Sequence, residues 1–512
     1  MKKVDVVVVG AGPVGLLLAV ELALGGAEVL VLERLDAPSP RIKALGVGPL
    51  GAEALGRRGL ADAMAAEEAR SLATMDLSWR GAGAGPRAPK FVGHFAFLFI
   101  REDPSSEPER RMRAIPQQGL ESMLGDRARA LGIDLRRGCE VTGFAERADG
   151  VDVEWTSPGG AGAVRCSYLV GCDGGRSAVR KMGGFAFPGT PPTMTMFQAV
   201  ADIDDPVGAL PRGWHRTPHG VFGRGPFPRR FFMLDFGGPP ADRDAPVTRE
   251  ELESVLRRVS GADVRVTAMD QANRWADNTR LADTYRRGQV LLAGDAAHVH
   301  SPFGGQGLSL GLGDAANLGW KLAAVLRGDG PGALLDSYTA ERRPVAEAVL
   351  ANTLAQAALL RPDPQSGALR DVLAGLLEMD EVNRRFGEMM RGLSNRYDLG
   401  SSHDLVGRLV GDRPLGPDGD TLYGLMQDGA GVLLDASRGG EASALAAGVP
   451  RLRCVRVDAG PSVLVRPDGC AAWAGEAGGT EGLAAALGRW FAPARTAGAP
   501  PAAPAALDGE AA

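Results

Sequence analysis

A glycine-rich turn near the N-terminus constrains the fold of this chain more than any other feature. Residues 4–9 form a nearly continuous apolar run, which is typical of a strand buried on both faces of a parallel sheet. Residues 14–24 have a helical pattern, and residues 29–32 form a second apolar run that ends at Glu33. Three glycines in the spacing GxGxxG join the first run to the helix: Gly10, Gly12 and Gly15. The chain therefore begins with a βαβ unit of the dinucleotide-binding kind.

Each glycine of this turn has its own physical task. Gly10 makes the tight turn, Gly12 lets the backbone approach a diphosphate, and Gly15 lets the helix and strand pack closely. The diphosphate meets the positive end of the helix and its unpaired N–H groups, while Glu33 accepts hydrogen bonds from a ribose. The unit alone leaves open whether the dinucleotide is FAD or NAD.

Two further motifs favour a flavin. Residues 171–174 (GCDG) follow the strand-like residues 168–170, and residues 294–298 (GDAAH) follow a buried run at 290–292. An aspartate at the end of a buried strand can hydrogen-bond a ribityl hydroxyl. The glycine-rich residues 302–307 then open a helix, whose N-terminal N–H groups can face the pyrimidine edge of a flavin and stabilise the negative charge of its reduced form.

The three motifs, in this order and spacing, resemble the group A flavoprotein monooxygenases built on the para-hydroxybenzoate hydroxylase fold. Within that group the chain is most similar to the aromatic polyketide hydroxylases of actinobacterial antibiotic pathways. The resemblance continues through residues 278–281, 317–323 and 341–344, and into residues 465–469 and Trp473. It covers nearly the whole chain and is specific for flavin-dependent monooxygenation, but much less specific for the substrate.

The resemblance implies an α/β fold with a Rossmann-like FAD-binding domain, a mainly β substrate layer and a C-terminal thioredoxin-like domain. Shifts in composition along the chain predict where these parts begin and end. The expected segments are 1–78, 101–182 and 275–394 (with long helices) for the FAD-binding domain, 79–100 and 183–274 for the substrate domain, 395–492 for the thioredoxin-like domain, and 493–512 for a disordered tail rich in Ala, Pro and Gly.

The resemblance also implies which residues hold FAD. Asp295 would bind the ribityl chain, residues 304–307 the edge of the flavin ring, and Asp173 with Gly174 both FAD and the nicotinamide. The expected cofactor contacts are Gly10, Gly12, Pro13, Val14, Gly15, Glu33, Arg34, Lys43, Gln117, Asp173, Gly174, Gly294, Asp295, Pro302, Gly305, Gln306, Gly307 and Leu308. No catalytic acid or base and no metal ligand is predicted from the sequence.

The chain departs from the family pattern at four positions around the expected flavin. Lys43 and Leu50 each stand where the family usually has an arginine; Ser309 replaces an asparagine and Gly313 a glutamine. Only six of the 57 basic residues are lysines, so Lys43 runs against the composition of the chain. These changes are expected to weaken FAD retention or alter the mobility of its ring, without removing Gly12, Glu33 or Asp295.

The expected reaction follows from the resemblance. NADPH or NADH, docking transiently because no second GxGxxG is present, reduces FAD, and O2 adds to give a flavin C4a-hydroperoxide shielded from water. Its distal oxygen then hydroxylates a polycyclic aromatic polyketide in antibiotic biosynthesis. The substrate is expected between the FAD-binding domain and the β layer, near residues 80–100 and 185–240.

Two other functions stay open on the sequence alone. The first is a Baeyer–Villiger reaction, in which the same flavin inserts oxygen beside a polyketide ketone. The second is a catalytically silent flavin-binding subunit, which the departures at Lys43, Leu50, Ser309 and Gly313 favour.

Composition limits the partners and the cellular compartment that are expected for this chain. A net charge of −5 and a pI near 5.8 argue against nucleic-acid binding, and no apolar run is long enough to predict a membrane span or signal peptide. Five cysteines without a CxxC pair argue against a disulfide framework, a zinc site and redox work in the thioredoxin-like domain. The expectation is a cytoplasmic monomer or homodimer.

Several single residues have both a functional and a structural interpretation. Arg176 and Arg180 predict either a phosphate clamp or structural ion pairs, and Asp314 is expected to begin or cap a helix. His298 and His300, two residues apart, favour packing or contact with the flavin edge over metal binding. The phenylalanines of the β layer are expected to be mainly sheet core, with some lining the pocket: Phe227, Phe231, Phe232 and Phe236.

Overall fold

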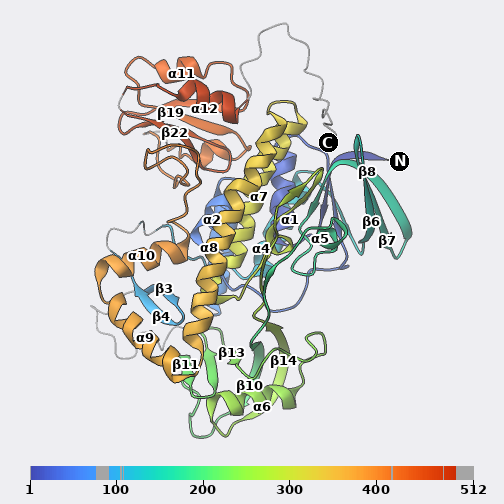
Figure 1. The fold of residues 1–512 in the computed structure, drawn as a ribbon, viewed down its shortest axis with the longest axis vertical. Helices are drawn as coiled ribbons and strands as arrows, with labels where there is room; N and C mark the ends of the chain where they lie inside the picture. Colours follow the sequence, from blue (N-terminus) through green and yellow to red (C-terminus); the bar gives the residue numbers. More distant parts are fainter. Residues whose placement is uncertain are drawn as a thin grey trace, which may run out of the picture.

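The computed structural model describes residues 2–76, 91–103, 107, 109–416, 419–476 and 478–491. It has the predicted α/β architecture: a large sheet flanked by helices, a separate antiparallel sheet and a small C-terminal α/β unit (Figure 1). Most of the Gly/Pro-rich stretch that opens the expected first substrate segment, and the expected tail at 493–512, lie outside the described residues.

The main sheet contains the N-terminal βαβ unit. Its strands run in the order β16-β17-β8-β1-β2-β5, and a β6–β7 hairpin extends β8. The bounds are β1 Lys3–Val9, β2 Val29–Glu33, β5 Asp134–Arg137, β6 Glu140–Arg147, β7 Gly150–Ser157, β8 Gly160–Gly171, β16 Arg286–Arg287 and β17 Val290–Leu292. The continuous apolar run of β1 is buried on both faces, as the sequence predicts, because helices cover both sides of the sheet.

The helices of this part are mostly buried and apolar. Helix α1 packs along α7, and α8 runs beside α7 through the length of the molecule (Figure 1). The bounds are α1 Pro13–Leu24, α2 Pro49–Gly56, α3 Ala61–Ala73, α4 Gln117–Ala130, α5 Ala178–Met182, α7 Gln306–Leu326 and α8 Asp336–Leu360. Helix α7 begins at Gln306, directly after Gly304 and Gly305, as the glycine-rich residues 302–307 predict, and eight residues before Asp314.

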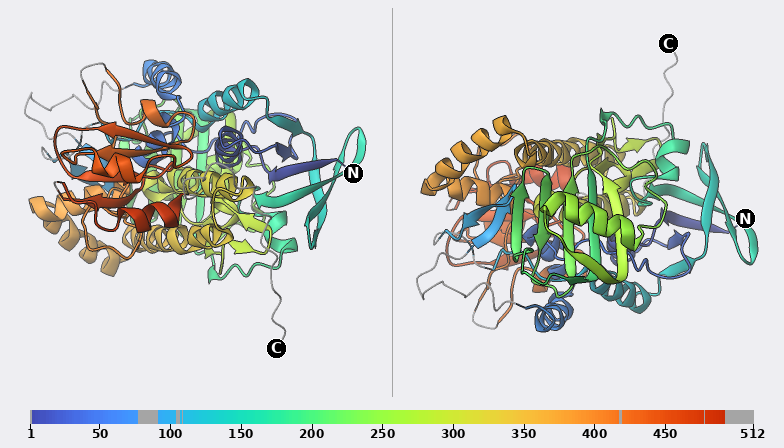
Figure 2. Two further views of the ribbon diagram at one scale, coloured as in Figure 1. Left: turned by 90° about the horizontal axis from the view of Figure 1, so that it is seen from above. Right: turned by 90° about the horizontal axis from the view of Figure 1, so that it is seen from below.

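A five-stranded antiparallel sheet forms the second layer, in the order β11-β12-β13-β10-β14. Helix α6 (Arg249–Ser260) lies across one of its faces (Figure 2). The strands are β10 Thr195–Asp204, β11 Gly213–Thr217, β12 Gly220–Arg224, β13 Arg230–Asp235 and β14 Arg265–Ala276. Alternate residues face opposite ways: Phe231 packs under α6, whereas Phe232 faces the rest of the molecule.

A short hairpin and two helices cover the end of this sheet. The hairpin consists of two strands, β3 (Phe91–Phe95) and β4 (Leu98–Arg101). Helices α9 (Pro364–Leu377) and α10 (Asp380–Arg391) pack on the hairpin (Figure 1), and Asn383 of α10 exchanges two hydrogen bonds of 2.9 Å with the backbone of Arg101. These helices therefore extend the wall around the antiparallel sheet.

The C-terminal unit is a four-stranded mixed sheet in the order β20-β19-β21-β22, as expected of a thioredoxin-like domain. Its elements are β19 Gly431–Asp435, α11 Glu441–Leu445, β20 Leu452–Arg456, β21 Ser462–Val465, β22 Ala471–Gly475 and α12 Leu483–Trp490. Residues 424–426 form a 3-10 turn before the first strand of this unit, which begins at Gly431. All five cysteines of the chain are free.

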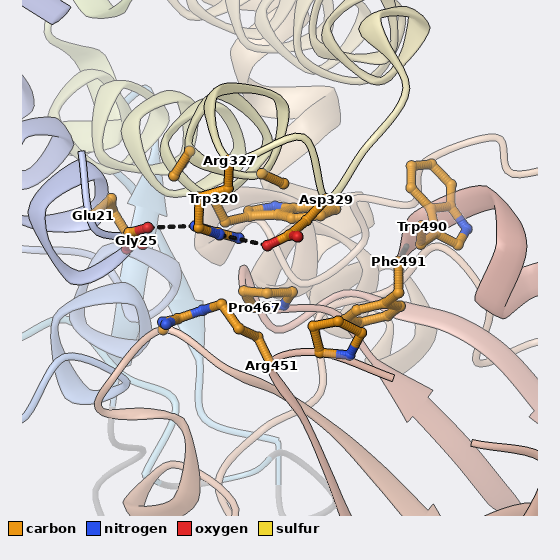
Figure 3. A pocket seen from close by; sticks show the side chains of 13 residues that line it. Glu21, Gly25, Trp320, Arg327, Asp329, Arg451, Pro467, Trp490 and Phe491 are labelled. Atoms are coloured by element: carbon orange, nitrogen blue, oxygen red, sulfur yellow. Dashed lines mark hydrogen bonds and ion pairs between the residues drawn. The ribbon is translucent and has the colours of Figure 1, made fainter. Parts of the chain in front are cut away.

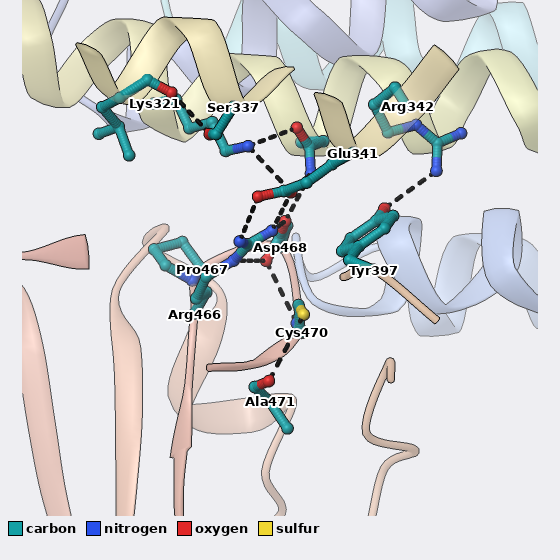
Figure 4. Close-up of polar contacts among 12 residues, drawn as sticks. Lys321, Ser337, Glu341, Arg342, Tyr397, Arg466, Pro467, Asp468, Cys470 and Ala471 are labelled. Carbon is teal, nitrogen blue, oxygen red and sulfur yellow. Dashed lines mark hydrogen bonds and ion pairs between the residues drawn. The ribbon is translucent and has the colours of Figure 1, made fainter. Parts of the chain in front are cut away.

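A buried ionic network joins this unit to helices α7 and α8 (Figure 4). Arg466, from the β21–β22 connection, donates two hydrogen bonds of 2.8 and 2.7 Å to Glu341 of α8. Lys321 of α7 donates to the same carboxylate at 2.9 Å, and Asn317 donates to both Glu341 and Asp468. Each carboxylate in this network faces at least one buried cation, so the charges of one unit balance those of the other.

Beside this network, aromatic side chains close the junction. A cavity of about 450 Å³ remains between α1, α7 and the C-terminal unit, with Trp320, Trp490 and Phe491 on its walls (Figure 3). Arg327 on its rim is paired with Asp329 at 2.7 Å and with the carbonyl of Gly25. The junction is therefore a packed interface in which the charged groups on the rim have partners.

Candidate functional site

The three sequence motifs meet at one edge of the main sheet. β1, β8 and β17 are parallel neighbours, and Gly171 is in register with both Val9 and Leu292. Because parallel strands end at the same edge, the residues that follow these strands come together there, although they are far apart in the sequence. This edge is the candidate site.

Two glycines of the first motif are required by packing. Gly10 has a φ of +105°, and a Cβ there would lie 2.5 Å from the carbonyl oxygen of Cys172. A Cβ on Gly15 would lie 2.0 Å from the carbonyl oxygen of Gly10. Both positions therefore need glycine so that the turn, α1 and the neighbouring motif can touch.

Gly12 has another task. Its φ of −75° and ψ of −179° suit any residue, and a Cβ there would meet no described heavy atom within 4 Å. No described side chain caps α1, so the first N–H groups of the helix lack an acceptor within it. Gly12 thus borders open space at the positive end of a helix, where the sequence predicts a diphosphate.

Glu33 lies beside this turn at the end of β2. Its Oε2 accepts a hydrogen bond of 2.8 Å from the N–H of Ala11, and its Oε1 accepts one of 2.9 Å from Leu35. The carboxylate is therefore fixed next to the turn, and its remaining lone pairs can accept from a ribose.

Asp173 of the second motif is only partly satisfied. Its Oδ2 accepts from the N–H groups of Ala178 and Val179 at 2.6 and 3.2 Å, which fixes the start of α5. Its Oδ1 is buried and has no partner among the described residues. A buried carboxylate oxygen without a donor is costly, so this atom calls for a donor from a ligand or water.

Asp295 of the third motif follows β17 at the same sheet edge. Its side chain is exposed, yet removal from bulk water raises the pKa of its carboxyl above the usual value, with His298 and Lys43 acting in the opposite direction. Lys43 is close enough to Asp295 for its charge to act on this carboxyl, so the structure brings these two predicted contacts near each other.

Gln117 joins the same surroundings from another element. It is the first residue of α4, and its N–H donates to the carbonyl of Ala44 at 3.0 Å. Its side-chain amide donates to Glu121 at 2.7 Å. The structure therefore brings Gln117 next to the segment that carries Lys43.

Residues 302–305 form the loop that leads into α7, and residues 306–308 belong to the first turn of that helix. Gly304 and Gly305 have φ values of +75° and +66°, and no described side chain caps the helix start. A Cβ on Gly307 would lie 3.1 Å from His300 Nε2, so the loop is packed on that ring. The side chain of Gln306 donates to the carbonyls of Met389 and Met390 and is thereby held on the end of α10.

The remaining predicted contacts differ in what they do. Pro13 is buried as the first residue of α1, and Val14 packs into the space left by the missing side chains of Gly294 and Gly311. Arg34 is exposed beyond β2. Gly174 of the second motif has a φ of +81°, and Gly294 of the third motif has a φ of +64°. Before α7, Pro302 is exposed, and Leu308 in the first turn of that helix is half-buried.

Sequence reasoning missed the role of Asp314. The prediction that it begins or caps a helix is wrong, because it lies within α7 with an exposure of 0%. Its carboxylate accepts from the N–H of Gly294 at 3.0 Å, from His298 Nε2 at 2.7 Å and from Arg342 Nε at 2.8 Å. Asp314 therefore anchors the third motif to α7 and α8, and the only signal for it was an acid in an apolar helix.

The two arginines that follow the second motif are engaged in structure. Arg176 pairs with Asp244 at 2.7 Å, and Arg180 is buried with hydrogen bonds to the carbonyls of Gly175 and Ala296. Their guanidinium groups therefore make the structural contacts that were one of the two interpretations of these residues.

Metal binding and membrane insertion have no support in the described part of the chain. Within the described residues, no cluster of His, Cys, Asp and Glu could hold a metal ion. His298 instead packs against Asp314. Among the same residues, no helix is long and apolar enough to cross a membrane.

The turn between β3 and β4 is strained and holds an aromatic ring against the antiparallel sheet. Ala96 and Phe97, between β3 and β4, have φ values of 49° and 64°, a conformation that costs a non-glycine residue about 1–2 kcal/mol. The turn is held because the N–H of Ala96 donates to Gln356 Oε1 at 2.9 Å. The ring of Phe97 stacks on Trp214, with centroids 4.1 Å apart.

The aromatic surface continues across the antiparallel sheet. The ring of Trp214 meets that of Phe232 edge to face, with ring centroids 5.1 Å apart. The ring centroid of Phe232 lies 6.3 Å from that of Trp275. These half-buried rings share one apolar cluster with Phe303 of the loop before α7. The surface therefore borders the loop that is expected to hold the flavin edge.

His94 adds a polar group to the aromatic surface. Burial, with the nearby charge of Arg370, lowers the pKa of its imidazole to about 4, so the ring is neutral at pH 7. The N–H of Phe97 donates to His94 Nδ1 at 3.4 Å, which places the ring proton on Nε2. No described residue accepts from Nε2, so His94 presents a free hydrogen-bond donor.

These observations fit FAD better than a smaller nucleotide. The open space at Gly12 suits a diphosphate, Asp173 and Asp295 offer unpaired oxygens to hydroxyl groups, and the uncapped start of α7 suits the negative edge of a flavin ring. The three features lie along one sheet edge, as an extended dinucleotide requires.

Comparison with known proteins agrees with this geometry. Residues 3–353 match the family model described as FAD binding domain, and residues 403–494 match the model described as aromatic-ring hydroxylase, C-terminal. A 12-dehydrotetracycline 5-monooxygenase/anhydrotetracycline 6-monooxygenase of Streptomyces rimosus is 42% identical, with 96% of this chain and 99% of the relative covered. A rifampicin monooxygenase of Streptomyces venezuelae is 38% identical over 96% of this chain and 100% of its own.

A solved structure is similar over the same extent. The anhydrotetracycline hydroxylase from Streptomyces rimosus superposes with a TM-score of 0.85 at 40% identity, covering 96% of this chain and 100% of that one. The likeness therefore includes the FAD-binding part, the antiparallel sheet and the C-terminal unit together.

Proposed function

This chain belongs to the FAD-dependent aromatic-ring hydroxylases, and from that premise we propose that it hydroxylates a polycyclic aromatic polyketide, with NAD(P)H and O2, in antibiotic biosynthesis. It is a monooxygenase and uses FAD. The proposal concerns the substrate class and the residues that bind cofactor and substrate.

One observation carries the proposal: the aromatic surface of the antiparallel sheet meets the flavin-binding loop through Phe303. A planar, electron-rich ring system stacked on Phe97 and Trp214 would lie beside the loop that precedes α7. Relatives whose names refer to tetracycline and rifampicin substrates support a large polycyclic substrate over a single phenol ring.

The residues at the sheet edge are assigned to the cofactor. Gly12 and the start of α1 would bind the diphosphate, Glu33 the adenosine ribose, and Asp295 with Asp173 the hydroxyl groups of the ribityl chain. When bound, FAD accepts a hydride from NAD(P)H and activates O2 for transfer of one oxygen atom. The uncapped start of α7 would stabilise negative charge on the flavin ring edge.

The substrate is assigned to the opposite wall. Phe97, Trp214 and Phe232 supply flat apolar contact and exclude water from the reacting ring. His94 Nε2 would donate a hydrogen bond to a phenolic or carbonyl oxygen and so fix which carbon faces the flavin. No acid or base is assigned to the oxygen transfer itself.

The test is turnover with a panel of substrates. We expect the yellow, FAD-loaded protein to oxidise NADPH or NADH faster when an anhydrotetracycline, anthraquinone or angucycline phenol is present, and the product to gain one atom from ¹⁸O2. A hydrolysable lactone product would overturn hydroxylation in favour of Baeyer–Villiger insertion. A protein that binds FAD but oxidises no NAD(P)H with any phenol of the panel would be the silent subunit.

A matched pair of variants tests the substrate wall. Trp214→Ala removes a stacking surface and should raise KM about three- to tenfold. Phe231→Leu, on the α6 face of the same sheet, should lower stability while KM stays unchanged. Equal KM changes in both variants would contradict the assignment.

We also propose that the protein acts in the cytoplasm as a monomer or homodimer. Support comes from its five free cysteines, which suit a reducing compartment. Light scattering of the FAD-loaded protein tests the oligomeric state, and a larger assembly would contradict the proposal.

A further inference from the structure

A second cavity lies behind the flavin-binding loop, on the side of α7 that faces α2 and α8. It has a volume of about 710 Å³. Its walls include residues 304–306 and Ser309 at the start of α7, Leu50 of α2, and Asn395 after α10. Three positions at which the sequence departs from the family pattern line it: Leu50, Ser309 and Gly313. Its walls come from α2, α7, α8, the end of α10 and the C-terminal unit, not from the aromatic surface assigned to the substrate.

Arg57 forms part of the wall of this cavity and has no ionic partner among the described residues. Its exposure is 1%, and its Nε and Nη1 are buried without a hydrogen-bond acceptor in that part of the chain. The guanidinium lies 5.1 Å from the ring centroid of Tyr423, which offsets only part of its desolvation. A charged group in this position is expected to have a counter-ion.

The neighbouring Arg58 is buried in the same surroundings, but its guanidinium has hydrogen-bond acceptors. Arg58 is equally buried, and its nitrogens donate to both oxygens of Glu21 and to the carbonyls of Arg57, Met426 and Pro467. Both oxygens of Glu21 thereby accept from Arg58, and Arg57 acts on Glu21 through its charge without a hydrogen bond.

The other nearby carboxylates are occupied in the same way. Glu53 pairs with Arg110, and Asp468 pairs with Arg466. The backbone of Gly469 packs against the guanidinium of Arg57, since a Cβ on this glycine would lie only 2.7 Å from the guanidinium carbon. Within the described chain, Arg57 is therefore a buried cation that forms no ion pair with a carboxylate.

The rest of the cavity identifies the kind of anion. Most of its lining is apolar, including Leu50, Ala54, Leu310, Val345 and Val349. Besides Arg57, two further arginines line it, and both are engaged: Arg342 with Asp314 and Tyr397, and Arg391 with backbone carbonyls. The carboxylate of Asp468 also lines the cavity and is paired with Arg466. One guanidinium without a carboxylate partner within largely apolar walls suits a monoanion with an apolar body better than a phosphate or sulfate.

A polar group near the loop supports the same ligand. Ser309 Oγ accepts from the N–H of Gly48 at 2.9 Å, so its hydroxyl proton remains available to donate. A carboxylate has acceptor capacity for both a guanidinium and a hydroxyl.

We propose that this cavity binds a small organic carboxylate with a compact aromatic or alicyclic body, its carboxylate paired with Arg57. The site is separate from the substrate surface and does not depend on which polyketide is hydroxylated. Because its walls include residues 304–306 and Ser309, its occupant would contact the loop that is assigned to the flavin edge.

The experiment uses the full-length, FAD-loaded protein and three probes: benzoate, its neutral isostere benzamide, and chloride. We expect benzoate to raise Tm in a saturable way by about 2 °C or more, with benzamide and chloride giving less than a quarter of that shift. The flavin absorbance, followed in the same samples, should show that FAD stays bound. Bromine anomalous scattering from a crystal with 4-bromobenzoate should place the ring in this cavity.

Two variants and a control variant test whether the rise in Tm with benzoate depends on this cavity. Arg57→Met removes an unpaired buried charge, so it should fold with a Tm no lower than the parent and lose the benzoate shift. Leu50→Phe fills the apolar part and should also lose the shift. Arg129→Met, at a side chain that is 74% exposed, should keep it.

Other results would contradict the proposed carboxylate site. If chloride gives the same shift as benzoate, the cavity takes a halide and the proposed class is overturned. If benzoate gives no shift, or the same shift in Arg57→Met and Leu50→Phe as in the parent, Arg57 is solvated by water alone and the proposal fails. Neither outcome would affect the monooxygenase assignment, which is tested by turnover.

Discussion

At the scale of single residues, the glycines of the first motif divide into two kinds. A Cβ on Gly15 would meet a backbone oxygen at 2.0 Å, whereas a Cβ on Gly12 would meet no described atom within 4 Å. Gly15 is therefore required by the packing of the fold, whereas Gly12 borders open space, in line with the separate tasks that the motif predicts for them.

This division predicts opposite effects for two matched substitutions. Gly12→Ala should leave the free energy of unfolding of the FAD-free protein unchanged but weaken FAD binding about tenfold or more, because its methyl group enters the space for the diphosphate. Gly15→Ala should lower the free energy of unfolding by about 3 kcal/mol. Urea unfolding and FAD titration measure the two effects. A Gly12→Ala protein that binds FAD normally would contradict the assignment of this turn to the diphosphate.

A second residue-scale prediction concerns pH. Burial, with the nearby His298, lowers the pKa of His300 to about 4, whereas an unfolded histidine titrates near 6.5. Between these values the unfolded chain binds one more proton than the folded chain at this residue. The free energy of unfolding should therefore fall by about 1.4 kcal/mol per pH unit as pH drops from 6.5 toward 4.

His300→Gln should remove this part of the pH dependence, and the same change at exposed His219 should not. Urea titrations at pH 7, 6 and 5 give the slope for each protein. Identical slopes in the parent and His300→Gln would show that His300 is protonated in the folded protein over this range.

At the scale of elements, the β3–β4 hairpin depends on a contact from a distant helix. Its turn has left-handed φ values at Ala96 and Phe97, neither of which favours them, and Gln356 of α8 accepts from the N–H of Ala96. The helix therefore holds the aromatic ring of Phe97 against Trp214.

Gln356→Leu should loosen this hairpin. It leaves the buried N–H of Ala96 without an acceptor, which should cost about 1–3 kcal/mol of unfolding free energy and raise KM for the polyketide. Gln118→Leu, which removes a surface hydrogen bond to the carbonyl of Arg41, should leave both nearly unchanged. An unaltered KM in a destabilised Gln356→Leu protein would separate the hairpin from substrate binding.

The elements also show how far the sequence can predict this structure. The run at β1, the GxGxxG turn and the acid at Glu33 depend on neighbours close in the chain, so local pattern is enough to find them. The turn at Ala96 and Phe97 contains no Gly, Asn or Asp and is imposed by Gln356, which lies 260 residues away. The role of Asp314 escapes local pattern for the same reason, because its partners His298 and Arg342 belong to other elements.

At the scale of the whole molecule, stability depends on charges shared between parts. Glu341 of α8 is the common acceptor for Lys321 of α7 and Arg466 of the C-terminal unit, and the side chains of both cations have an exposure of 0%. Burial lowers the pKa of Lys321 to about 8, although Glu341 opposes this. The network therefore keeps two cations charged away from water.

Glu341→Gln should lower the free energy of unfolding by about 3–5 kcal/mol, because two buried cations lose their shared counter-ion. Asp126→Asn, which breaks the surface pair with Arg129, should change it by about 0.5 kcal/mol or less. Urea unfolding of the FAD-loaded proteins compares them. If Glu341→Gln and Asp126→Asn lowered the free energy of unfolding by a similar amount, the buried network would contribute no more to stability than a surface ion pair.

The same network limits how this gene can be recombined with those of its relatives. Arg466 and Asp468 are encoded far downstream of Asn317, Lys321 and Glu341, yet the five side chains form one hydrogen-bonded group. A chimera that takes its C-terminal unit from a protein with other residues at these positions inherits unmatched buried charges, even if each half is well folded in its own parent. Domain exchange to alter substrate choice will therefore succeed only when both sides of the junction are transferred together.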